Sequence, residues 1–589
     1  MALPALTFPG DDASISSLVN QDTTMQDAFW IIDQEVNKYQ TYIVTLWRGR
    51  NSCAPISRLP PEMLCKIFDF TSRDETRGSL HWIKVSHVCH AWRNIAVNSP
   101  SLWTNLPVTN ARWTEEMLSR SKMAGLTVKA DFLYSYRKSF DATVASALQH
   151  TLRIQHLSLS NGNAGVIQKL LSGLPKSAPR LESLCVHVTH QRPMYVGASK
   201  PDEICELPET VLSGVDCLRR LEVTRCKVNW NSHRWSFLTY LKIHDAPLAF
   251  RLTRTQLVAA LKRMPLLESL DLQETLLVTG DSEQPLEKIF LAHLAMLTIA
   301  SSTPQVQMFL KSILFLPTVI LTVICKPTGT SGSDFSGVLS EIASIISPST
   351  KSPGLRFRTL EVLRPSTGSD GLQFKAYTTV ASDMEATYGH IKPSLDVSLI
   401  HSMTMPATAE KIFKDVCEAI SLGNVVNLHL LLSHGVGFTT RILAETFGQL
   451  DHLRSVCVTG VCSKEFTRAL QEIQANQNLK KSRNPLLYFC NLRSISMRDV
   501  TFDEDRGDLT IEALQDCLIW RYECGVEILD LKIEDCYGIT ETNVFLLEDI
   551  VVNLEWDGVE LELSDEEDNG DEDEDSDSEN DSDLDNCPW

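Results

Sequence analysis

Along most of the chain, apolar residues follow a short repeated spacing: one position, a second three residues later, and a third two residues after that. The alternation at the end of each copy predicts a short β-strand with one buried face. Runs with helical spacing separate the copies, for example at 254–263, 409–419 and 464–474. The pattern therefore predicts a mixed α/β chain. Copies begin at Ile154, Leu181, Leu218, Leu238, Leu267, Leu294, Leu316, Phe357, Val425, Leu453, Leu492 and Val526.

This L-x-x-L-x-L spacing resembles a degenerate form of the leucine-rich repeat. The resemblance implies an irregular solenoid with a parallel curved sheet over residues 107–563. The copies are unevenly spaced and mostly lack the final N/C-x-L element, so an α/β domain of another kind remains the alternative. Residues 364–402 have weak periodicity and are either an insertion or a worn repeat.

A different pattern occupies residues 24–50, where apolar residues alternate steps of three and four, as in an amphipathic, heptad-like helix. Two interpretations are open: self-association or partner binding, and packing of the helix back on a neighbouring domain. Short isolated helices are marginal in water, which favours packing. Residues 1–23 are predicted to be disordered. The heptad positions are Phe29, Ile32, Val36, Tyr39, Ile43 and Leu46.

Residues 56–106 contain three short helical patterns. Pro60 and Pro61 suit the first turn of a helix, and Glu62 follows at the positive end of its dipole. Three such helices have more apolar surface than they can bury among themselves. We therefore expect one face to pack internally and another to meet a partner.

The phrases LPPE (59–62), IF (67–68), VSHVCHAWR (85–93) and SLW (101–103) together resemble an F-box, in its F-box-like form. In that family the three-helix motif docks on the Skp adaptor of SCF-type cullin–RING ubiquitin ligases. The loop 72–79 is longer than usual, which leaves the angle between the first two helices open. The alternative is the core of an ordinary helical domain. By position, the adaptor-binding set is Leu59, Pro60, Leu64, Ile67, Phe68, Val85, Val88, Cys89 and Trp92.

The polar positions between the buried strand residues should form the exposed face of the sheet. This face is polar and of mixed sign, which suits recognition of a target protein. For any single residue, a merely solvated position is the alternative. The candidate target-binding residues are His187, Glu222, Lys242, His244, Asp271, Gln273, Arg498 and Lys532.

The chain has a net charge of −21, which argues against a general binder of nucleic acid or anionic membranes. The charge is uneven, because residues 565–585 include fourteen acidic residues and no basic ones. Mutual repulsion without an apolar face predicts that 564–589 form a disordered acidic tail.

The first twelve residues lack the basic and apolar regions of a signal peptide, and the longest apolar run, 312–325, is too short to span a membrane. We expect a cytoplasmic or nuclear protein with reduced cysteines. There is no C-x-x-C pair, and the cluster of His81, His87, Cys89 and His90 spans a helix junction, so we expect no metal.

Common phosphate-loop, dinucleotide, nucleophile-elbow and H-E-x-x-H motifs are absent from the sequence. We therefore expect no cofactor and no catalysis. The F-box resemblance followed by repeats implies a substrate receptor of an SCF-type ubiquitin ligase, binding the Skp adaptor, and through it cullin, and a target protein. The alternative is a scaffold that acts outside any ligase.

Overall fold

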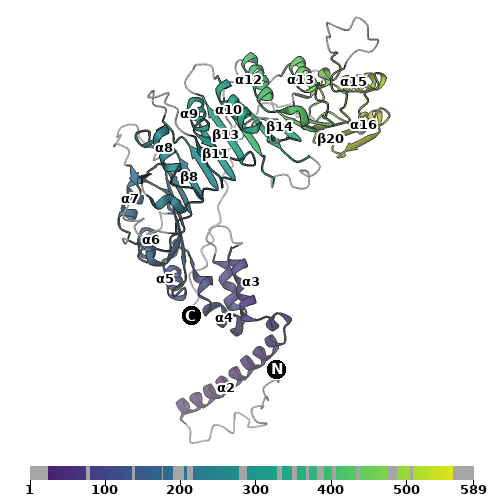
Figure 1. Ribbon diagram of the computed structural model, residues 1–589. Coiled ribbons are helices and arrows are strands. Elements are labelled where there is room, and N and C mark those ends of the chain that lie inside the picture. The colour runs from purple at the N-terminus through teal and green to yellow at the C-terminus, as the bar shows by residue number, and fades with distance from the viewer. Residues whose placement is uncertain are drawn as a thin grey trace, which may run out of the picture. The chain divides into compact units, whose positions relative to one another are not determined.

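The computed structural model describes residues 24–73, 80–134, 139–174, 177–189, 204–208, 217–231, 233–277, 288–327, 334–347, 354–365, 371–380, 391–400, 406–432, 438–460, 462–473, 487–503 and 509–561. The chain divides into two compact units, Met1–Glu341 and Ile342–Trp589. Figure 1 labels their helices and strands. Both segments predicted to be disordered, 1–23 and 564–589, lie outside the described residues, as do positions 74–79 of the predicted loop.

The first unit opens with the heptad-like helix α2 (Met25–Ser52). The Thr24 side chain caps it by accepting a hydrogen bond from the Asp27 amide at 3.3 Å. None of its residues is buried, and Phe29 is 60% exposed. A 3₁₀ turn, η1 (Pro55–Arg58), links α2 to the three-helix region.

The three predicted helices of the next region have different lengths and types. The first is the α-helix α3 (Pro61–Arg73), the second is the 3₁₀ helix η3 (His81–His87), and the third is α4 (His90–Val97). A further 3₁₀ turn, η4 (Pro100–Trp103), carries the last aromatic residue of the motif.

A parallel sheet occupies the rest of the first unit, and its strands pair in chain order. Two short parallel pairs form separate two-stranded sheets: β5 (Cys205–Glu206) pairs with β7 (Cys226–Lys227), and β10 (Ile289–Phe290) pairs with β12 (Ile313–Leu314). The strands of the main sheet are β1 (Asn105–Leu106), β2 (Leu126–Asp131), β3 (Ile154–Gly162), β4 (Ser183–Val188), β6 (Arg220–Thr224), β8 (Tyr240–His244), β9 (Ser269–Gln273), β11 (Met296–Ser302) and β13 (Ile320–Lys326).

Helices and 3₁₀ turns connect these strands and lie along one face of the sheet (Figure 1). That face is the buried one, because alternate strand residues such as Leu184 and Val186 are fully shielded from solvent. The helices are α5 (Ala111–Arg120), α6 (Phe140–Leu148), α7 (Ala164–Ser172), α8 (Arg254–Leu261), α9 (Thr303–Leu310) and α10 (Ser336–Ile346), and the turns are η5 (Phe132–Tyr134), η6 (Thr151–Arg153), η7 (His233–Phe237) and η8 (Leu248–Phe250).

The second unit combines parallel and antiparallel pairing. The parallel series runs from β14 to β17, β18, β19, β20 and β21. On the other side of β14, β15 pairs antiparallel with both β14 and β16. Its strands are β14 (Thr359–Leu363), β15 (Gly371–Tyr377), β16 (Leu395–Ile400), β17 (Asn427–Leu431), β18 (Ser455–Thr459), β19 (Ser494–Arg498), β20 (Asp530–Glu534) and β21 (Asn553–Trp556), and its helices are α12 (Pro406–Ala419), η9 (Leu422–Asn424), α13 (Thr440–Phe447), α14 (Cys462–Ala469), α15 (Ile511–Glu523) and α16 (Glu541–Glu548).

Packing in the second unit includes an aromatic cluster and a buried cation. The Phe413 ring lies 4.4 Å from that of Phe438 and 5.5 Å from that of Phe447. Arg521 is fully buried on α15, where its guanidinium donates to the carbonyls of Leu470 at 3.1 Å and Phe489 at 2.8 Å. These bonds compensate the burial of the charge and hold α15 against the chain between α14 and β19.

The predicted mixed α/β chain, with helices near its N-terminus and a large, mostly parallel sheet, is confirmed. Residues 364–402 contain two antiparallel strands, so they depart from the parallel pattern as an insertion would. Among the described helices, none combines the length and apolar character that a membrane crossing requires.

Two copies of the motif were placed two residues too early. Leu297 and Ile299 pair with Leu321 and Val323, so these two residues continue the buried column. The copy starting at Leu316 instead assigned Val319 and Leu321 to these positions. Likewise Ile495 pairs with Leu531, and the copy starting at Val526 should start at Ile528. A shift of two preserves the inward and outward faces, because strand side chains alternate with a period of two.

A recurrent backbone feature marks the ends of several strands. The residue after β6, β8, β9, β19 or β20 has a left-handed conformation, with φ between 49° and 57°. In the first four cases the amide of this residue donates to a carbonyl at or near the end of the next strand; the Asp245 amide, for example, bonds the Gln273 carbonyl at 2.8 Å. The same turn thus ends strands in both units. The five residues are Arg225, Asp245, Glu274, Asp499 and Asp535.

We predict that Asp499→Val will destabilise the second unit by about 1–2 kcal/mol, because a β-branched side chain is strained in the left-handed conformation. Asp499→Gly is the matched control, since glycine adopts this conformation readily and the Asp499 side chain is exposed. Amide hydrogen exchange of β19 and β20 in the full chain measures the effect. Equal protection in the two variants would contradict the prediction.

Candidate functional site

The three-helix region, which we call the docking module (residues 56–107), has a small aromatic core. Phe68 on α3 is fully buried, and its ring lies 5.0 Å from that of Trp92 on α4. Trp82 on η3 lies 5.1 Å from Trp103, whose indole nitrogen donates to the Ala96 carbonyl at 2.8 Å. These contacts tie all the helices of the module together.

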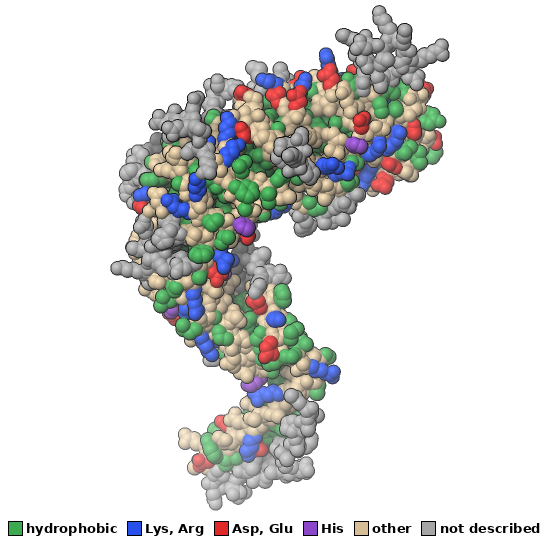
Figure 2. Space-filling model, viewed as in Figure 1, with side chains coloured by type: hydrophobic (Ala, Val, Ile, Leu, Met, Phe, Trp, Pro, Cys, Tyr) green, Lys and Arg blue, Asp and Glu red, His purple; other side chains and the backbone are tan. Residues whose placement is uncertain are grey.

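Apolar side chains remain exposed around that core. Phe70 is 72% exposed and Val88 is 60% exposed, although a single buried side chain of this size contributes about 1.5–3 kcal/mol. Figure 2 shows hydrophobic side chains at the surface in the region of α3 and α4. The module therefore has an apolar surface for which the described chain supplies no cover. Its exposed large apolar residues are Ile56, Leu59, Met63, Ile67, Phe70 and Val88.

The predicted adaptor-binding set divides into two groups. Leu64 and Phe68 belong to the core, at 3% and 0% exposed, so their role is to support the module and they do not present a contact surface. Their position i, i+4 on α3 explains this, because both side chains lie on the helix face opposite solvent. The remaining members are at least partly accessible: Leu59, Pro60, Ile67, Val85, Val88, Cys89 and Trp92.

Cys89 has a local structural role that its motif position does not reveal. It is the N-cap of α4, and its sulfur accepts the Trp92 amide at 3.5 Å. The cap fixes the start of α4 and with it the position of the Trp92 ring.

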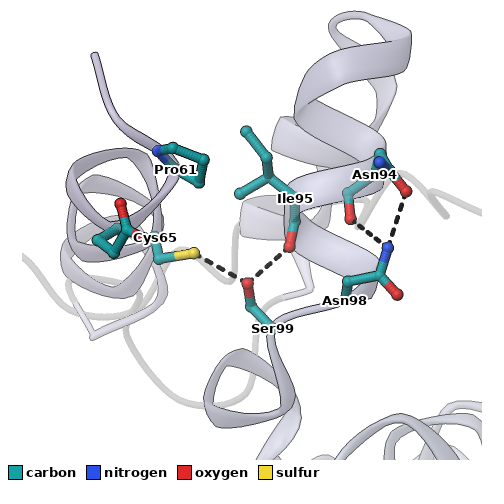
Figure 3. A pocket seen from close by; sticks show the side chains of 7 residues that line it. Pro61, Cys65, Asn94, Ile95, Asn98 and Ser99 are labelled. Carbon is teal, nitrogen blue, oxygen red and sulfur yellow. Dashed lines mark hydrogen bonds between the residues drawn. The ribbon is translucent and has the colours of Figure 1, made fainter.

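A hollow between α3 and α4, seen in Figure 3, was not predicted from the sequence. Cys65 and Ser99 meet across it, with 2.8 Å between Sγ and Oγ, and the Ser99 hydroxyl donates to the Ile95 carbonyl at 2.6 Å. Asn98 donates to the Asn94 side chain at 2.7 Å along its edge. Small polar residues scattered over two elements leave no periodic signal, which explains why the sequence did not indicate it.

An uncovered apolar surface on a compact helical module is typical of a site for protein–protein interaction. Residues 56–107 match the family model described as F-box-like. The chain therefore carries an F-box-like domain at these residues. Domains of this family bind Skp-type adaptors in general, so protein–protein interaction is part of what the chain does.

The predicted target-binding residues of the first unit lie together on the face of the sheet opposite the helices, which we call the open face. Strand register places Glu222, Lys242 and Asp271 side by side on β6, β8 and β9. A second row brings together His187, Thr224, His244 and Gln273. Both rows consist of half-buried polar side chains.

Charges on this face pair with one another. Arg220 donates from Nε to Glu222 at 2.7 Å, and its guanidinium lies 3.6 Å from the centre of the Tyr240 ring. His244 Nε2 lies 3.0 Å from an Asp271 oxygen. Hydrogen bonding to Cys185 and to Glu222 raises the pKa of His187 to about 9. Hydrogen bonds from His187 and Arg220 outweigh burial and lower the pKa of Glu222 to about 2.

The second unit places Arg498 and Lys532 on its own sheet, on β19 and β20. Both side chains form ion pairs with Glu534, and Lys532 Nζ lies 2.9 Å from Glu534 Oε1. Burial acts to raise the pKa of Glu534, but the hydrogen bonds from Arg498 and Lys532 prevail and lower it. Glu534 was missed because the motif copy there was placed two residues early. Glu361 was also missed; it is buried and accepts the Tyr377 hydroxyl at 2.9 Å.

We predict that Phe68→Ala will destabilise the docking module by about 3–5 kcal/mol, the usual cost of removing a buried phenylalanine ring. Phe70→Ala on the same helix is the control, because that ring is 72% exposed and should cost little. Hydrogen exchange of α3 and α4 in the full chain compares them. If both variants kept wild-type protection, the aromatic core described above would be wrong.

Proposed function

We propose that the chain is the substrate-recognition subunit of an SCF-type cullin–RING ubiquitin ligase. The observation that supports this most directly is the uncovered apolar surface of a module that matches the F-box-like family. A docked adaptor would remove Ile67, Phe70 and Val88 from water, which supplies the driving force for binding. Cullin would be reached through the adaptor.

In this proposal the open faces of the sheets bind the target protein. Half-buried groups of both signs, fixed by strand register, offer directional hydrogen bonds with little loss of side-chain freedom on binding. His187, Lys242 and Asp271 are central in the first unit, and Arg498 and Lys532 in the second. Mixed charge favours a protein target over nucleic acid or an anionic membrane.

The receptor itself forms and breaks no bond. Its contribution is positioning, because holding a target beside the ligase raises the effective concentration of target lysines at the loaded ubiquitin carrier. We propose that it acts without cofactor, in the cytoplasm, the nucleus or both.

We predict that Ile67→Asp combined with Val88→Asp will abolish co-purification with a Skp-type adaptor. Both side chains are accessible on the module, and a docked carboxylate would be buried without a partner. Leu152→Asp is the matched control, since Leu152 is a 62% exposed leucine outside the module. Circular dichroism confirms folding of each variant. Undiminished adaptor binding by the double variant would refute the receptor proposal.

A second measurement separates the ligase receptor from a scaffold that uses the same module. We predict that proteins captured by the full chain will have longer half-lives when the cullin is inhibited. Lys242→Glu should weaken their capture at least several-fold, whereas Lys169→Glu on the helical side of the same unit should not. Partners with unchanged half-lives would point to the scaffold.

A further inference from the structure

Three side chains of different chemistry converge at one place on the open face of the first unit. One ligand atom each from Cys185, His187 and Glu222 lies within 4.8 Å of the others. A thiol, an imidazole and a carboxylate are the side chains that bind Zn²⁺ in proteins. None of the three is fully exposed, so the cluster is part of the built surface of the sheet.

Strand geometry brings the three residues together. Cys185 and His187 are two residues apart on β4, so their side chains lie on the same face. On the neighbouring strand β6, Glu222 is the register partner of Cys185. The cluster thus needs no loop rearrangement to form, and its residues are held by backbone pairing on both sides of β4 and β6.

The second polar atom of two of these side chains is already occupied. Glu222 accepts Arg220 through Oε1, at 2.7 Å from Nε, while its Oε2 faces the cluster. His187 hydrogen-bonds Thr224 Oγ1 through Nδ1 at 2.6 Å, while its Nε2 lies 3.7 Å from that Oε2. The Cys185 sulfur lies 4.0 Å from the same oxygen. Outer partners of this kind orient the ligands of metal sites and fix the imidazole tautomer.

We propose that Cys185 Sγ, His187 Nε2 and Glu222 Oε2 form a binding site for a single Zn²⁺ ion, with the fourth position open to water or to a partner's side chain. Zinc–ligand distances of about 2.0–2.3 Å require tetrahedral ligand atoms roughly 3.3–3.8 Å apart. The observed 3.7 Å and 4.0 Å separations are close to this range. Binding displaces the thiol proton and any proton on Nε2, and the thiolate and carboxylate offset the charge of the ion.

Two cationic side chains near the proposed site reduce the affinity that Glu222 can contribute. Arg220 and Lys242 both lie beside Glu222, so the thiolate of Cys185 must supply much of the affinity. The site is therefore selective for a thiophilic ion over Mg²⁺ or Ca²⁺, which prefer oxygen ligands.

Cobalt titration tests the site directly. The full chain, reduced and stripped with a chelator, is titrated with Co²⁺, which reports tetrahedral coordination by visible d–d bands and thiolate ligation by a near-ultraviolet charge-transfer band. We expect saturation at one equivalent and loss of both bands when Zn²⁺ is added. Cys185→Ser should remove the charge-transfer band. His187→Ala removes a ligand, so it should weaken Co²⁺ binding by more than the about 10–100-fold that loss of an outer partner typically costs.

Cys457→Ser is the matched control, because Cys457 is also half-buried on a strand and faces a histidine, His429, in register. It should leave both bands unchanged. Absence of both bands in the wild type, or a charge-transfer band unaltered in Cys185→Ser, would overturn the proposal. Adaptor co-purification by the same variants is expected to be normal, so failure here is distinguishable from failure of the receptor function.

Discussion

In-register parallel pairing of neighbouring strands is the constraint on which most of the molecule depends. It stacks the buried residues of successive strands in columns, as with Leu184, Leu221 and Leu241, which pair directly and are at most 2% exposed. The same register stacks the intervening polar residues on the open face. A slip of one residue would exchange the two faces, so burial of the leucine columns also fixes which polar groups meet.

The docking module, in contrast, leaves part of its apolar surface exposed. Its core is small and includes aromatic contacts such as Phe68 with Trp92, and other apolar side chains, Phe70 and Val88 among them, stay mostly exposed. The helices and turns between the strands cover the apolar face of the sheet, whereas three short helices cannot enlarge their core. The module therefore keeps an apolar surface exposed, whereas the sheet buries its apolar face and leaves only its polar face open to solvent.

This difference between the sheet and the docking module explains which features could be predicted from the sequence. The alternation of apolar and polar residues predicts which strand residues are buried and which lie on the open face. This prediction stays correct even when a copy is misplaced by two residues, as at Leu316 and Val526. The end of β20 was lost by that shift, and with it Glu534. In the module, spacing alone did not separate the buried Leu64 and Phe68 from the accessible Ile67, because all three are apolar on one short helix. The antiparallel strand β15 has no local signature, since pairing direction is a tertiary property.

Pairing on the open face also bears on how a partner is recognised. Glu222 is shared by Arg220 and His187, and Glu534 by Arg498 and Lys532, so much of the charge is satisfied within the sheet. A partner attracted by net charge alone would have to break these bonds without compensation. Under the proposed function, recognition would therefore depend on shape and on directional bonds to groups that keep one polar atom available. His187 and Glu222 in the cluster with Cys185 are such groups, because each uses one polar atom within the sheet and turns the other toward the cluster.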